Sequence, residues 1–135
     1  MNGSPPDAVV VAGGINDCGT VASAAGMPVQ DVGDEALKYF QALRAGAPNM
    51  LIIVLGPFTD WNNAEYSSHL TSCRNAIFAS AAKVSGTYTV DVSDWVSLAN
   101  RDQVFLTTKN GPHPIDSGHE IYGKRAADAI RALFP

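Results

Sequence analysis

The sequence has little of what several classes of protein require. Its 135 residues include two cysteines, Cys18 and Cys73, which form neither a disulfide framework nor the spacing of a metal site. Nine lysines and arginines are spread thinly over a chain of net charge −4, so we expect no nucleic-acid partner. The longest mainly apolar run, Met50 to Phe58, is far shorter than the ~20 residues of a membrane-spanning helix. Because no charged-then-apolar leader opens the chain, we expect neither a signal peptide nor an anchor.

What is present is the composition of a folded protein with one domain. Apolar residues make up 46% of the chain and charged residues 16%, which excludes the charge-rich disordered class. We therefore expect residues 1–135 to form a single domain. The two cysteines are interpreted as a free thiol and a core residue rather than a redox pair. A disulfide that holds the segment 15–33 against a helix is the alternative.

The hydrophobic pattern alternates between short apolar runs and helical periodicity. Continuous apolar runs predict strands over 8–12 and 50–55, and a third strand is predicted over 88–92. Helical spacing predicts helices over about 34–45, about 64–84 and from Ser117 onward, where 117–120 fits a capping box. Loops are expected over 15–33 and 101–115, with a short helical turn over 94–100. This order predicts an α/β fold, a three-layer α/β/α sandwich around a parallel sheet.

Polar residues follow the predicted strands, at the edge of a parallel sheet where ligands bind. Asn16 comes directly after the first strand and can present its amide N–H to a ligand oxygen. His113 stands between two prolines before the last helix and can act as a base. Acyl transfer needs such a donor for the oxyanion and such a proton acceptor. The simpler alternatives are an ordinary turn at Asn16 and Asp17, and a surface histidine at position 113.

Two segments resemble conserved blocks of a known family. Residues 6–17, PDAVVVAGGIND, are similar to the third block of the SGNH (GDSL-type) ester hydrolases, in which a strand leads into G-x-N-D. Residues 113–119, HPIDSGH, are similar to the fifth block, HP-x-x-x-GH. The resemblance covers essentially the whole chain. It implies a flavodoxin-like parallel sheet and hydrolysis of carboxylic esters, often acetyl groups on sugars, short-chain lipids or peptidoglycan components.

The resemblance also implies roles for individual residues. Asn16 would donate to the oxyanion, Gly14 would let the backbone approach the substrate, and His113 would be the general base. No metal ion or other cofactor is implied. The partner would be a small acyl ester, with an acylated carbohydrate as one candidate, and members of the family are often secreted. The flanking residues are expected to contact the substrate: Ile15, Asp17 and Pro114.

The sequence departs from the family pattern at two catalytic positions. The nucleophilic serine of the family lies well upstream of G-x-N-D, but here only Ser4 precedes the first strand, without a strand before it or a helix after it. The family has an aspartate three residues before its histidine, whereas this chain has Asn110. In serine hydrolases such a change can lower turnover by as much as ~10⁴. The alternative function is therefore a catalytically inactive remnant that binds carbohydrate or another protein.

The absent nucleophile block predicts an N-terminally truncated domain. In the family, a further strand lies beside the strand that carries G-x-N-D. Without that strand, residues 8–12 would form an exposed apolar edge, which is a template for pairing with another chain. We expect a second copy of the chain, in a homodimer, or a complementing fragment to cover this edge.

Overall fold

The computed structural model describes residues 5–19, 26–59, 66–105 and 113–134. Strands and helices alternate along the chain, as the hydrophobic pattern predicts. None of the described helices is long and apolar enough to cross a membrane. The elements are β1 (Ala8–Ala12), α1 (Ile15–Cys18), α2 (Val29–Gly46), β2 (Leu51–Leu55), α3 (Ser68–Ala81), β3 (Thr87–Val90), α4 (Arg101–Val104) and α5 (Asp116–Leu133).

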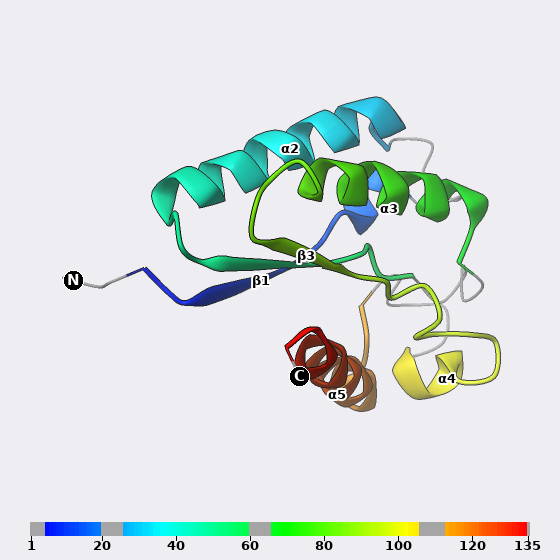
Figure 1. Cartoon of the computed structure of the whole chain (residues 1–135). Helices are drawn as coiled ribbons and strands as arrows, with labels where there is room; N and C mark the ends of the chain where they lie inside the picture. Colours follow the sequence, from blue (N-terminus) through cyan, green and yellow to red (C-terminus); the bar gives the residue numbers. More distant parts are fainter. Residues whose placement is uncertain (1–4, 20–25, 60–65, 106–112, 135) are drawn as a thin grey trace.

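The described strands form one parallel sheet in the order β1-β2-β3. Helices α2 and α3 cover one face of this sheet, and α4 and α5 lie on the opposite side (Figure 1). A parallel sheet needs helical crossovers, and these place apolar helix faces against both faces of the sheet. The α/β fold expected from the sequence is confirmed.

Strand β2 contributes alternate side chains to two separate cores. Ile52 and Val54 belong to the first core, which lies between the sheet and helices α2 and α3. Ile53 and Leu55 belong to the second core, which lies between the sheet and α5. Each of these four side chains is at most 5% exposed, so β2 is buried on both faces, which its unbroken apolar sequence requires.

Among the described residues, β1 forms one edge of the sheet and β3 forms the other. The Asp7 carbonyl accepts a hydrogen bond from Leu51 N–H at 2.8 Å. The N–H and C=O groups of successive residues in a strand point to alternate sides. Those of Ala8, Val10 and Ala12 therefore point away from β2. The Val10 side chain is 48% exposed on the α5 face of the sheet. The exposed apolar edge expected from the sequence is present in this part of the structure.

The segment from residue 15 to residue 33 differs from the predicted loop. Residues 15–18 form α1, and α2 begins at Val29 after Pro28 rather than near residue 34. The apolar stripe of α2 extends one turn further toward its N-terminus than the prediction, because Val32 is buried in the first core together with Phe40. A four-residue helix such as α1 is too short to produce a periodic pattern.

The capping box predicted at the last helix is wrong. Helix α5 begins at Asp116 after Ile115, whose side chain makes no capping hydrogen bond. The hydroxyl group of Ser117 instead donates to the Gln103 carbonyl at 2.7 Å. Position 118 must be glycine, since a Cβ there would lie 2.2 Å from the Val104 carbonyl oxygen.

Other element boundaries also shift. Helix α4, over residues 101–104, interrupts the loop predicted over 101–115, and residues 93–95 and 98–100 form turns and a bend rather than a helical turn. Helix α3 ends at residue 81 rather than 84, and β3 ends at 90 rather than 92. Helix and strand ends depend on tertiary contacts, which hydrophobic periodicity does not contain.

Candidate functional site

The first candidate residues lie where β1 turns into α1. Gly14 has a φ of +100°, and a Cβ at this position would lie 3.1 Å from Ile77 Cδ1. Only glycine adopts this conformation without strain and fits so close to α3. The turn places Asn16, exposed on α1, at the carboxyl edge of the sheet.

A disulfide joins α1 to α3. Cys18 and Cys73 form it, and their exposed fractions are 1% and 0%. The preferred interpretation from the sequence, a free thiol and a core residue, is therefore wrong. Two cysteines 55 residues apart carry no spacing signal that could have identified the pair. His69 also holds Cys18, because its Nε2 makes a hydrogen bond to the Cys18 carbonyl.

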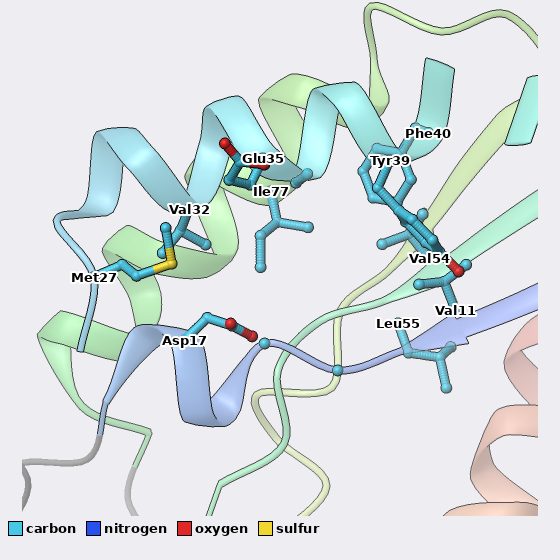
Figure 2. A pocket seen from close by; sticks show the side chains of 13 residues that line it. Val11, Asp17, Met27, Val32, Glu35, Tyr39, Phe40, Val54, Leu55 and Ile77 are labelled. Atoms are coloured by element: carbon cyan, nitrogen blue, oxygen red, sulfur yellow. The ribbon is translucent and has the colours of Figure 1, made fainter. Parts of the chain in front are cut away.

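A pocket of about 220 Å³ opens beside Gly14, between β1 and α2. We call it the β1 pocket. Figure 2 shows Asp17 reaching toward it from α1, while α2 contributes Glu35 and Tyr39. Its walls are mainly apolar, so it fits an apolar group next to two carboxylates. The lining residues are Val11, Gly13, Gly14, Asp17, Met27, Val32, Glu35, Ala36, Tyr39, Phe40, Val54, Leu55 and Ile77.

A second hollow, of about 390 Å³, lies on the other side of the sheet at the start of α5. We call it the α5 groove. The rings of Phe58 and Tyr122 stack in it with their centroids 4.4 Å apart. Tyr122 is 8% exposed, its hydroxyl group has no hydrogen-bond partner among the described residues, and burial raises its pKa. The lining residues are Leu55, Phe58, Pro114, His119, Tyr122, Gly123 and Ala126.

The predicted site residues are divided between these two hollows. Gly14 and Asp17 line the β1 pocket, and Pro114 lines the α5 groove. His113 is exposed and directly precedes Pro114. Leu55, the last residue of β2, lines both hollows, which brings them together at the carboxyl edge of the sheet.

Three other candidate residues are Ile15, Asn110 and Ser4. Ile15 is half-buried and packs against the first core, so its side chain stabilises α1. Asn110 and Ser4 lie outside the described residues. Within the part of the chain that the structure describes, no hydrogen bond joins Asn16 to His113, and no group of three or more metal-ligating side chains is found.

An ion pair that the sequence does not predict also lies at this edge. Arg74 on α3 donates to Asp91 at 2.7 Å, and its guanidinium carbon lies 5.7 Å from the centre of the Tyr66 ring. Burial alone would raise the pKa of Asp91, but hydrogen bonds from Ser93 and Arg74 outweigh it and lower this pKa below its ordinary value. An arginine within a helix has no sequence signal that identifies its partner.

Comparison with known proteins supports the fold. No protein-family model matches the sequence, and no curated protein matches it. A solved structure of a Corynascus thermopiles (Myceliophthora fergusii) carbohydrate esterase family 2 enzyme plus carbohydrate binding domain matches with a TM-score of 0.59. It is 24% identical over 93% of this chain, and the chain spans 37% of that protein's length. This likeness shows the fold alone, which is an α/β fold.

Proposed function

We propose that this chain belongs to an ester hydrolase of the SGNH type that cleaves small acyl esters, with acylated carbohydrates as the candidate substrates. The observation that carries the proposal is the glycine-dependent turn at Gly14, which leads into Asn16 at the carboxyl edge of the sheet. The structural likeness to a carbohydrate esterase supports the same class of reaction. Proline and histidine residues at the start of α5 lie at that edge as well.

In the proposed reaction, a serine hydroxyl attacks the ester carbonyl and His113 accepts its proton. The carbonyl oxygen becomes an oxyanion, which the side-chain N–H of Asn16 stabilises. As the tetrahedral intermediate collapses, the bond to the alcohol breaks and His113 returns the proton to the leaving oxygen. Water then hydrolyses the acyl-enzyme by the same steps. The sequence does not identify the serine, since Ser4 matches the family's nucleophile block poorly.

The α5 groove is the proposed place for the acyl group. Pro114 lines it, and the exposed His113, the proposed base, directly precedes Pro114 in the chain. Leu55, Phe58 and Ala126 provide apolar walls, as hydrocarbon groups require. The groove also extends to Leu55, which borders the β1 pocket that contains Gly14.

The experiment is hydrolysis of p-nitrophenyl acetate together with labelling by a fluorophosphonate probe. We expect His113→Ala to lower kcat/KM at least 100-fold, and Asn16→Ala to lower it about 10²-fold to 10³-fold. Lys124→Ala, an exposed position on α5, is the control and should leave turnover unchanged. Equal turnover in the wild type and His113→Ala would contradict the proposal. No labelling, and no turnover of the wild type above that of His113→Ala, would rule out an esterase in this chain.

A further inference from the structure

We infer that His69 and the Cys18–Cys73 disulfide are positioning groups that hold Asn16 in place from α3. The catalytic meaning of Asn16 rests on the proposed function, whereas the placement of α1 is a property of the fold. Asn16 lies two residues before Cys18, where any movement of α1 moves its amide.

Helix α1 cannot hold this position by itself. It has four residues, and an isolated helix of that length is unstable because nucleation fixes more dihedral angles than one hydrogen bond repays. Its internal contacts are few, namely Cys18 N–H to the Gly14 carbonyl at 2.8 Å and Gly19 N–H to the Asn16 carbonyl at 3.3 Å. The order of α1 must therefore come from tertiary contacts.

Those contacts converge on Cys18 from one face of α3. His69 and Cys73 lie one helical turn apart on α3, so their side chains project from the same face. Cys73 binds the Cys18 sulfur, and His69 binds the Cys18 backbone carbonyl. Since a carbonyl only accepts, the His69 Nε2 carries the proton and donates it. Holding both the side chain and the backbone of Cys18 fixes the orientation of α1 as well as its position.

Helix α3 is itself a rigid support. Its Leu70 is 1% exposed in the first core, and Ser80 donates a buried hydrogen bond of 2.7 Å to the Gly33 carbonyl of α2. An oxyanion donor works only when its N–H is held in advance where the charge develops. Anchoring α1 therefore fixes the backbone of Asn16, so that its exposed side chain can be held in the position that an oxyanion donor requires.

The test measures amide hydrogen exchange by NMR at two reporters of α1. These are Cys18 N–H, bound to the Gly14 carbonyl, and Met27 N–H, bound to the Asp17 carbonyl at 2.7 Å. Ile52 N–H, bound to the Gly86 carbonyl at 3.0 Å, reports on the sheet. We expect His69→Ala to accelerate exchange at both reporters at least tenfold with no change at Ile52, and His69→Gln to restore slow exchange, because its amide also donates.

Two further variants separate positioning from general stability. Cys18→Ala/Cys73→Ala should accelerate exchange at Met27 more than at Ile52. Ser80→Ala is the matched control, since it weakens α3 at the opposite end and should not act selectively on α1. Unchanged exchange at Met27 in both His69→Ala and the cysteine variant would overturn the inference. So would acceleration of equal size at Met27 and Ile52.

The outcome for positioning is independent of the outcome for catalysis. If the wild type hydrolyses ester, His69→Ala should lower kcat with little change in KM, and His69→Gln should recover most of it. If the wild type has no turnover, but His69→Ala accelerates exchange at the α1 reporters and not at Ile52, the result would support the positioning groups and contradict the proposed function. If turnover depends on His113, but His69→Ala accelerates exchange equally at Met27 and Ile52, the result would support the proposed function and contradict the positioning groups.

Discussion

Arg74 and Asp91 join helix α3 to the segment that follows β3, at the carboxyl edge of the sheet. Their ion pair, with 2.7 Å between Arg74 Nη1 and Asp91 Oδ2, joins α3 to the segment after β3. Asp91 also accepts the Ser93 backbone N–H at 2.9 Å, so one carboxylate fixes both a helix and a turn. Arg74 is largely covered, with 16% of its side chain exposed, whereas Asp91 is 53% exposed.

Replacement of Asp91 should give a pH-dependent loss of stability. A carboxyl group with a lowered pKa in the folded state stabilises the fold above its unfolded pKa, and this contribution disappears as the pH falls. Asp91→Asn should lower the free energy of unfolding at pH 7 by less than about 1 kcal/mol, since solvent screens the exposed carboxylate. The difference in free energy of unfolding between the wild type and Asp91→Asn should shrink below pH 3.8, the ordinary pKa of the carboxyl group. Urea unfolding of both proteins at pH 7 and pH 3 measures this difference, and an equal difference at the two pH values would contradict the prediction.

Removal of the disulfide should cause a much larger loss. The bond closes a loop of 55 residues, which restricts the unfolded chain. Cys18→Ala/Cys73→Ala should therefore lower the free energy of unfolding by about 4 kcal/mol. Urea unfolding of the oxidised wild type and the double variant provides the measurement. The control is wild type whose disulfide has been reduced while the chain is unfolded, and its free energy of unfolding should equal that of the variant. A difference of less than about 1 kcal/mol between the oxidised wild type and the variant would rule out a structural disulfide.

Two adjacent glycines allow a matched test of the turn before α1. Gly14→Ala should cost about 1–3 kcal/mol, because alanine at a φ of +100° is strained and its Cβ would press on Ile77. Gly13 has no neighbouring atom within 4 Å of a built Cβ, so Gly13→Ala should change stability by less than about 1 kcal/mol. Thermal unfolding of the two variants checks the contrast. Equal losses would mean that the conformation of Gly14 is not the cause.

The edge of β1 should make the protein associate with itself. We propose that a second copy covers this edge, because its outward peptide groups and the exposed Val10 have no charge or proline to block pairing. The mass from light scattering should rise with protein concentration, and Val10→Lys should return it to that of one chain. Leu98→Lys, at an exposed position outside the sheet, is the control. A wild type that stays at the mass of one chain at ~0.1 mM would contradict the proposal, since non-specific contacts are weaker than paired strands.

The sheet was the part of the fold that the sequence predicted best. Residues 8–12 match β1, and the runs 50–55 and 88–92 lie within two residues of β2 and β3 at each end. Strand β2 is buried on both faces, and such a strand needs apolar side chains along its whole length, which produces the continuous apolar run 50–55. The strand ends then place Asn16 at the carboxyl edge before any coordinates are known.

The contacts that organise the candidate site could not be predicted in the same way. The cysteine pair and the hydrogen bond from His69 join residues that are far apart in sequence, and neither leaves a local pattern. The sequence places His69 on a predicted helix but does not indicate that its partner is the Cys18 carbonyl. Ser117 fits a capping box by spacing, yet its hydroxyl group finds the Gln103 carbonyl of a neighbouring element. Tertiary partners compete with local ones, and sequence spacing describes only the local ones.

The division of the interior into two cores has a consequence for the order of folding. The first core takes its residues from positions 9–84, whereas the second requires α5, which packs against β3 and is joined to it by the long connection 91–115. Closing the longer loop costs more chain entropy before any contact compensates for it. We therefore expect the half that contains α2, β2 and α3 to form first, and α5 to dock onto a sheet whose other face is already packed.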